Sequence, residues 1–136
     1  MVSVPEWIVS SVDEFGRGMG LKGLRLNENG AVSFTFENGL RLGMEYAYES
    51  LTMILTAKAE AGDAEAAKQL AEAHPTVKRP FRVRVGYLAE SGEAAFAARL
   101  PEREVDLVAL TTVFQELWRL GEGLKGYRVK GLRCAS

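Results

Sequence analysis

Apolar and polar side chains alternate through residues 32 to 45, and the alternation changes phase around Asn38 and Gly39. An Asn-Gly pair is typical of a two-residue hairpin loop. That loop would put the phenylalanines before it on the same face as Arg41 and Glu45. A three-residue loop of residues 37–39 instead gives the pairs Phe36 with Leu40, Phe34 with Leu42 and Val32 with Met44. Because the longer loop gathers the apolar side chains on one face, the pattern predicts Gly39 in the left-handed conformation.

Three further stretches show the period of a strand. The stretch SLTMILTAKA, residues 50–59, predicts a third strand. One face consists of Leu51, Met53, Leu55 and Ala57, and the other of Thr52, Ile54, Thr56 and Lys58. Residues 81–89 and 93–100 predict a second hairpin, with its turn at Ser91 and Gly92. In its first strand Arg82 and Arg84 alternate with the apolar side chains of Phe81, Val83, Val85 and Tyr87.

Helical spacing of apolar residues predicts a first helix near the N-terminus. Ser3 and Glu6 have the spacing of a capping box, so the helix is expected to begin there. Its apolar stripe consists of Ile8, Val12, Phe15 and Met19, and it ends near Gly20. Gly16 and Gly18 lie inside it, and each costs about 1 kcal/mol relative to alanine. Some packing contact must offset that cost.

Two more helices follow the same spacing. The alanine-rich stretch 61–75 predicts a short helix with a shallow apolar face, which Pro75 stops. After Pro101, a wide apolar stripe predicts a last helix ending at Gly121; the stripe contains Leu107, Leu110, Phe114, Leu117 and Trp118.

The predicted order is helix, three strands, helix, two strands, helix. Strands joined by tight turns pair antiparallel, so the pattern predicts an α+β fold, α-β-β-β-α-β-β-α, with a five-stranded antiparallel sheet and the helices packed on one face. Residues 1–122 are expected to form one domain, because no linker, repeat or low-complexity segment divides them. The chain of 136 residues is long enough to bury roughly two thirds of its unfolded surface without a metal or disulfide.

Charge is unevenly distributed along the chain. Residues 123–136 carry four basic residues and no acid, whereas residues 1–122 carry 13 basic and 18 acidic residues and a net charge of −5. An acidic body disfavours a nucleic-acid partner. The basic, glycine-rich tail is expected to be flexible. Short, charge-interrupted apolar runs predict neither a membrane span nor an export signal, and a single cysteine suits a reducing cytoplasm.

Candidate chemistry is sparse. His74 is the only histidine, and its position at a helix end is explained by a favourable interaction with the helix dipole. Cys134 is the only cysteine and has no neighbouring histidine to activate it. The glycines of residues 16–20 end a helix instead of opening one, so they do not match a phosphate-binding loop. These residues predict no catalytic site, no metal site and no cofactor.

Three groups of residues allow both a structural and a functional interpretation. Glu45 and Glu49 are expected to be solvated charges and not a catalytic pair. Arg82 and Arg84 fit a half-exposed strand, and could also contact phosphate or a partner's carboxylates. Two long helices cover only one face of a five-stranded sheet, so the surplus of apolar side chains indicates either ordinary core packing or a partner surface.

With these elements in order, residues 8–121 resemble the class I type III secretion chaperones, the Tir-chaperone-like family of small bacterial proteins. The family's first helix typically ends in a pattern like Leu-Gly-x-x-Leu-Gly-Leu, and FGRGMGL at residues 15–21 is similar. The stretch LRLNENGAVSFTFENGLRLGME resembles the family's leucine-rich segment, glycine-containing turn and hairpin. ARLPEREVDLVALTTVFQELW resembles its closing strand and helix.

The resemblance implies a non-enzymatic, cytoplasmic homodimer that binds the extended N-terminal segment of a secreted effector along apolar patches and keeps it soluble and secretion-competent. An extended segment can add a strand to a sheet edge and place alternate side chains in apolar pockets. The effector-binding residues expected on this basis are Phe15, Met19, Leu26, Phe34, Phe36, Leu42, Met44 and Ile54. The residues expected in the dimer interface are Leu70, Phe81, Val83, Val85 and Tyr87.

Two other classes of function remain open at this point. A small-molecule-binding or enzymatic α+β domain would need a cavity between sheet and helices, with converging polar groups. An RNA-binding sheet would use Arg82, Arg84 and Tyr87, which the acidic body disfavours. Neither a nucleic-acid nor a membrane partner is expected.

Overall fold

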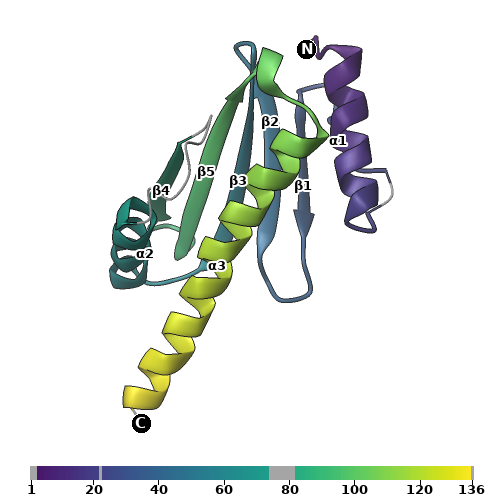
Figure 1. The fold of residues 1–136 in the computed structure, drawn as a ribbon. Helices are drawn as coiled ribbons and strands as arrows, with labels where there is room; N and C mark the ends of the chain where they lie inside the picture. Colours follow the sequence, from purple (N-terminus) through teal and green to yellow (C-terminus); the bar gives the residue numbers. More distant parts are fainter. Residues whose placement is uncertain (1–2, 22, 74–81, 136) are drawn as a thin grey trace.

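The computed structural model describes residues 3–21, 23–73 and 82–135, and the side chains of residues 3–21, 23–69 and 82–124 (Figure 1). The predictions for His74, Pro75, Phe81 and the side chains of Leu70 and Cys134 lie outside these residues.

The elements follow one another in the predicted order. They are α1 (Glu6–Gly18), β1 (Ala31–Thr35), β2 (Arg41–Ala47), β3 (Ser50–Lys58), α2 (Ala61–Ala73), β4 (Val83–Leu88), β5 (Glu93–Pro101), the short 3-10 helix η1 (Glu102–Glu104) and α3 (Leu107–Ala135).

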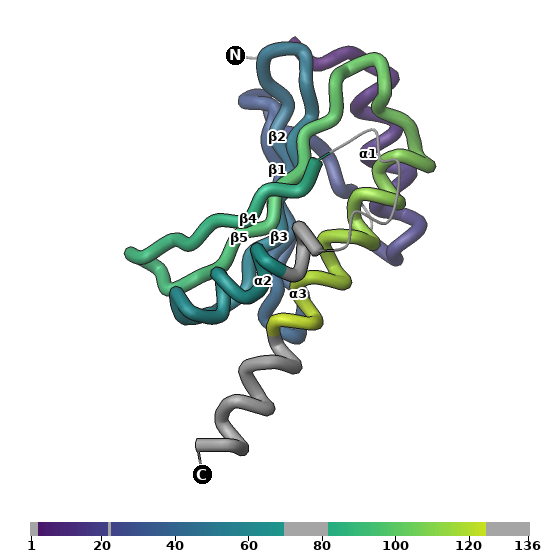
Figure 2. The backbone as a smooth tube through the Cα atoms, turned by 60° about the vertical axis from the view of Figure 1, so that its left-hand side comes forward, coloured from purple at the N-terminus to yellow at the C-terminus, as the bar shows by residue number. Residues whose placement is uncertain are grey.

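All five strands join one antiparallel sheet in the order β1-β2-β3-β5-β4, so β1 and β4 are its two edges. Long helix α3 crosses the sheet, and Figure 2 shows α1 and α3 on the same side of it. Helix α2 lies against β4 and α3. The predicted fold class is therefore confirmed.

The core lies between the sheet and the helices. Alternate residues of the strands point toward the helices and are buried; they include Leu42, Met44, Leu51, Met53, Leu55, Phe96 and Leu100. The helices contribute buried side chains from single stripes, among them Ile8, Val12, Phe15, Leu110, Val113, Leu117 and Leu120. Burying one such side chain stabilises the fold by about 1.5–3 kcal/mol. The opposite face of the sheet, which we call the open face, carries the remaining strand residues.

The β1–β2 hairpin has the predicted register. Val32 is opposite Met44 and Phe34 is opposite Leu42, while the Phe36 amide donates to the Leu40 carbonyl at 2.8 Å. Gly39 has a φ of 92°, and Asn38 is not among the residues with positive φ. The three-residue loop is thus confirmed, and it places the phenylalanines of β1 on the helix-covered face.

Gly39→Val is expected to lower the free energy of unfolding by about 1–2 kcal/mol, because a β-branched side chain strongly disfavours positive φ. Among the described residues, no heavy atom outside its chain neighbours lies within 4 Å of a Cβ built at residue 39, so the strain would be conformational and not steric. Gly39→Asn is the matched control and should cost less, because asparagine tolerates this conformation. Urea denaturation of the three proteins checks the order, and equal stability of all three would contradict it.

The beginning of α1 and the end of α3 differ from the sequence prediction. Pro5 is the N-cap of α1, and no described side chain caps the helix, so the predicted capping box of Ser3 and Glu6 is wrong. Pro5 instead places its carbonyl to accept from the Ile8 and Val9 amides at 3.0 and 3.2 Å. Helix α3 continues past Gly121 to Ala135, because Gly121 does not adopt positive φ and serves a close contact with Leu55. The division of the chain into a domain of residues 1–122 and a flexible tail stays a prediction.

Candidate functional site

Five aromatic side chains from three elements meet beside the edge strand β1, and we call them the aromatic cluster: Phe15 of α1, Phe34 of β1, Phe36 after β1, and Phe114 and Trp118 of α3. Phe36 lies at the centre. Its ring centroid is 4.9 Å from that of Phe34, 5.0 Å from Trp118 and 6.2 Å from Phe114. Phe114 also contacts Phe15 and Trp118, each at 5.5 Å. Three of the pairs are edge-to-face, namely Phe15–Phe114, Phe34–Phe36 and Phe36–Trp118, and such pairs each add about 0.5–1.5 kcal/mol.

Local structure explains how the cluster forms. Phe34 and Phe36 are two residues apart, so the period of a strand puts both on the face toward α3. Phe114 and Trp118 are four residues apart, so they lie one above the other on α3. The hairpin is also tied to α3 by a hydrogen bond of 2.9 Å from the Asn38 amide group to Glu122 Oε1.

The aromatic cluster is only partly covered. Phe15 is buried at 2% exposure, whereas the other four rings are half-buried. They lie at the side of the sheet where β1 has no further strand neighbour among the described residues. An apolar surface that remains accessible beside a strand edge can take both the backbone and the side chains of an extended polypeptide.

The backbone of β1 supports such an addition. Phe36, Phe34 and Val32 belong to the positions that hydrogen-bond to β2, because the Phe36 amide donates to Leu40 and the ladder alternates along the strand. Ser33 and Thr35 therefore direct their backbone N–H and C=O groups outward, away from β2.

The predicted effector-binding residues are distributed over three environments. Phe15, Phe34 and Phe36 belong to the aromatic cluster. Leu26, Leu42 and Met44 are buried in the core at 9, 2 and 3% exposure, and Met19 packs against that core half-buried. Ile54 lies on the open face, because it alternates with the buried Met53 and Leu55. The structure thus brings three of the eight residues together at one partly exposed site.

Sequence reasoning missed Phe114 and Trp118 as members of the site and assigned them to the core stripe of the last helix. The fully buried stripe of α3 consists of Leu110, Val113, Leu117 and Leu120. Phe114 and Trp118 each directly follow a member of that stripe, so they lie at its margin. The apolar stripe of this helix is wider than packing on the core requires, and its aromatic residues lie along one side of it. That width was the signal that could have placed them in the site.

The predicted dimer residues that are described lie on β4, the other edge of the sheet. Val83 and Val85 are half-buried and pack against the core, and Tyr87 is 38% exposed. The neighbouring Leu88 is 45% exposed but belongs to the open face.

Two polar contacts hold η1, the short helix that precedes α3, against the β2–β3 hairpin. The Tyr46 hydroxyl donates to Glu102 Oε1 at 3.2 Å, and the Glu102 amide donates to the Glu49 carbonyl at 2.9 Å. Burial, with the nearby carboxylates of Glu102 and Glu49, raises the pKa of Tyr46 above its ordinary value. The hydroxyl therefore stays protonated, and can donate this hydrogen bond, at an alkaline pH where an ordinary tyrosine begins to ionise.

The described residues offer little support for a small-molecule site or a metal site. A cavity of about 540 Å³ lies at the end of α1 and is lined by Asp13, Arg17, Gly20, Gly23 and Arg25, where Arg17 already pairs with Asp13 at 2.9 Å. This cavity is not the one between sheet and helices that a small-molecule site would need. Among the described residues, no group of three His, Cys, Asp or Glu side chains could hold a metal ion.

None of the helices, as far as the chain is described, combines the length and apolarity needed to cross a membrane.

Comparison with solved structures gives the same fold. The Pseudomonas aeruginosa ExoT-SpcS complex matches with a TM-score of 0.64 and 14% identity, covering 88% of this chain and 98% of that one. The ExsC-ExsE complex matches with a TM-score of 0.69 and 15% identity over 89% of this chain and 92% of that one. The Yersinia pestis type III secretion chaperone SycH, in complex with a stable fragment of YscM2, matches with a TM-score of 0.65 and 17% identity over 86% and 98%.

Comparison with curated proteins by sequence gives no match. The family model of the Tir chaperone protein (CesT) family, however, matches residues 10–125. This range contains α1 from its second turn, the whole sheet and the part of α3 that carries the aromatic cluster. The resemblance noted in the sequence is therefore confirmed, and the chain belongs to the Tir chaperone protein (CesT) family.

Proposed function

We propose that this protein is a cytoplasmic, non-enzymatic chaperone that acts as a dimer, binds the extended N-terminal segment of a type III effector and keeps that segment soluble until secretion. The observation that carries the proposal is the partly exposed aromatic cluster beside the free edge of β1, in a chain of the Tir chaperone family. Support also comes from the solved complexes of similar fold, which include a secretion chaperone with a bound protein fragment.

The proposed binding mode uses the backbone and the aromatic cluster together. An extended segment pairs with the outward groups of Ser33 and Thr35, so its backbone hydrogen bonds are satisfied whatever its sequence. Alternate side chains of the segment then point toward Phe34, Phe36 and Trp118. Their burial supplies the favourable free energy, about 25 cal/mol for each Å² of apolar surface removed from water. Sequence-tolerant pairing suits a chaperone that must bind its cargo unfolded.

Effector binding can be tested with the full chain as bait. We expect it to capture one secreted protein from the bacterium that encodes it, and limited proteolysis of that complex to leave the N-terminal segment of the captured protein bound. Capture through a folded domain, with the N-terminal segment cleaved as fast as in the free protein, would contradict the proposal.

Self-association is proposed through the face of β4 that carries Val83, Val85 and Tyr87, together with α2. In support, the inner side of this edge strand is incompletely covered and Tyr87 is exposed. A two-fold axis would bring the same patch of each subunit together.

Tyr87→Ser is expected to shift the protein from dimer toward monomer, because it removes an aromatic side chain from the centre of the proposed interface. Light scattering at low micromolar concentration measures the mass. Trp7→Ser is the matched control, since Trp7 is 46% exposed on α1, and it should leave the mass unchanged. A wild-type mass equal to one chain at about ten times that concentration would disprove the dimer.

A further inference from the structure

Three arginines gather at the β4 side of the open face, and we call them the arginine triad: Arg82, Arg84 and Arg99. Arg84 is opposite Ala97 in the β4–β5 register, and Arg99 follows Ala97 by two residues on the same face. The register that pairs Val83 with Ala98, continued by one residue, sets Arg82 beside Arg99. All three side chains are exposed. The sequence left open whether Arg82 and Arg84 contact a ligand. Strand pairing now places a third arginine, Arg99 of β5, near them.

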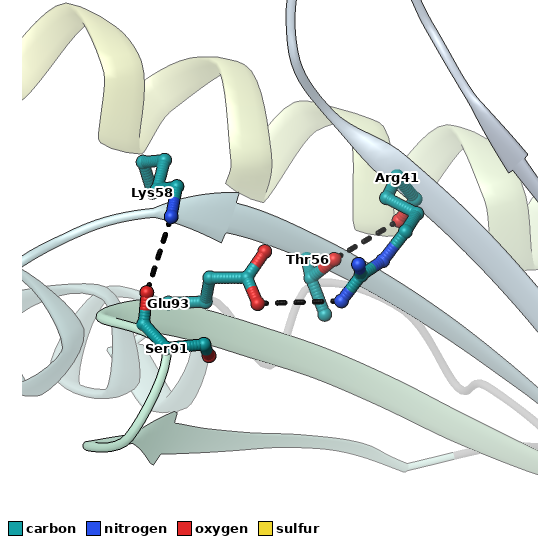
Figure 3. Close-up of polar contacts among 5 residues, drawn as sticks. All are labelled: Arg41, Thr56, Lys58, Ser91 and Glu93. Atoms are coloured by element: carbon teal, nitrogen blue, oxygen red, sulfur yellow. Dashed lines mark hydrogen bonds and ion pairs between the residues drawn. The ribbon is translucent and has the colours of Figure 1, made fainter.

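The arginine triad differs from the other cations of the open face, because it lacks partners among the described residues. Figure 3 shows Arg41 with its guanidinium toward Glu93 and Lys58 toward the Ser91 carbonyl, at 3.3 and 3.2 Å. No ion pair or hydrogen bond involves a side chain of the triad within the described part of the chain. Glu45, another acid of this face, lies two strands from Arg99, about 10 Å away.

This arrangement costs stability within the chain itself. Like charges on neighbouring strands of one sheet face repel each other, and no described ion pair offsets the repulsion between Arg84 and Arg99. The triad also lies on a body whose residues 1–122 have a net charge of −5, so positive charge is concentrated where the rest of the surface is acidic. Such a loss of stability is expected at a site where a bound ligand supplies the negative charge that the chain itself does not place there.

The surface beside the arginine triad is formed by small side chains and is partly apolar. Gly43, Ile54, Ala97 and Arg84 form one row across four strands, so Ile54 stands next to small side chains on both sides. Ile54 was predicted from the sequence to contact the effector, and the structure separates it from the aromatic cluster by the thickness of the sheet. Its half-buried side chain offers an apolar contact beside Arg84 and Arg99.

We propose that the arginine triad and Ile54 bind an acidic, extended segment of the protein that this chaperone escorts. The proposal rests on the function proposed above and adds a second contact of defined charge. Arginine binds carboxylates through paired hydrogen bonds, which suits this surface to glutamate and aspartate side chains. The triad faces away from Val83 and Val85, so dimer formation through β4 leaves it accessible.

An acidic polypeptide fits better than a nucleic acid. Sheets that bind RNA stack bases on aromatic side chains of their open face. Here the aromatic residues of the strands, including Tyr87 and Phe96, point to the helix-covered face, and the described open face carries none. The negative phosphates of a nucleic acid would also extend beyond the triad over residues 1–122, whose net negative charge repels them.

The test uses the full-length protein and a fluorescein-labelled peptide of alternating glutamate and serine, with a glutamine–serine peptide of equal length as reference. Fluorescence anisotropy at low salt measures both dissociation constants. We expect wild-type protein to prefer the glutamate peptide, and Arg84→Gln/Arg99→Gln to weaken that binding about tenfold. The control Arg17→Gln/Lys68→Gln removes two exposed positive charges on α1 and α2 and should change binding less than about twofold.

Each alternative outcome overturns the proposal. Equal loss in both double variants would show general attraction and no site. Unchanged binding in Arg84→Gln/Arg99→Gln would place the contact elsewhere, and tighter binding of an oligothymidylate than of the glutamate peptide would identify a nucleic-acid surface. Because the peptides are synthetic, these results do not depend on capture of an effector, and failure here leaves the aromatic cluster to be judged by its own test.

Discussion

Trp118→Ala is expected to weaken binding of the captured effector segment about thirtyfold, which corresponds to about 2 kcal/mol. Trp118 contacts Phe36 at 5.0 Å and Phe114 at 5.5 Å between ring centroids, and it remains half-buried. Its free surface is therefore available to a segment lying along β1. Tryptophan buries the largest apolar area of any side chain, so its removal takes away both the contact and the support for Phe36.

Titration calorimetry of the segment with wild-type and variant chaperone gives the two dissociation constants. Val108→Ala is the matched control, because Val108 also lies on α3 but is 74% exposed and outside the aromatic cluster. Trp118→Phe keeps an aromatic ring and should retain most of the affinity. Circular dichroism and thermal unfolding establish that each variant is folded. Equal affinities for Trp118→Ala and Val108→Ala would remove the aromatic cluster from the binding surface.

The aromatic cluster and the arginine triad lie on opposite faces of one sheet, and that separation has a consequence for binding. A segment that reaches both must cross an edge of the sheet, so it wraps around the domain and does not fill a pocket. Wrapping keeps the segment extended, which prevents it from folding on its own. In the proposed binding mode the apolar contact supplies affinity, and the charged contact would favour cargo with acids at a suitable distance.

Most of the fold could be predicted from the sequence because the decisive signals are local. The register of the β1–β2 hairpin follows from alternation and from one glycine that tolerates positive φ. The backbone of Tyr48 and Glu49, between β2 and β3, is left-handed with φ of 51° and 55°, which no local signal in the sequence indicates. Neither residue favours that conformation, so the surrounding strand pairing imposes it.

The site was predicted less completely, because it depends on which side chains from distant elements meet. Phe34 and Phe36 were identified from one strand, whereas Phe114 and Trp118 join them only once α3 has crossed the sheet. The arginine triad has the same origin: Arg82 and Arg84 form a visible pair in the sequence, and only strand pairing adds Arg99. Residues that are far apart in the chain carry no local pattern that links them.

The two glycines in α1 were expected to cost stability, and the structure separates their roles. A Cβ at Gly16 would lie 2.6 Å from the Leu24 Cβ and 3.3 Å from the Leu21 carbonyl oxygen. Gly16 therefore allows the segment that leads into β1 to pack directly on the helix. No described atom outside its own neighbourhood lies within 4 Å of a Cβ at Gly18, which is exposed at the end of the helix.

Gly16→Ala is therefore expected to lower the free energy of unfolding by about 3 kcal/mol, since Leu24 is buried and its Cβ cannot move without the backbone. Gly18→Ala should raise it by up to about 1 kcal/mol, because alanine favours a helix and meets no obstacle there. The same chemical change thus has opposite signs two residues apart, and thermal and urea denaturation measure both. If both alanines stabilise the protein, the close approach of α1 to Leu24 is absent, and Phe15 is not held against Phe114 in the way the aromatic cluster requires.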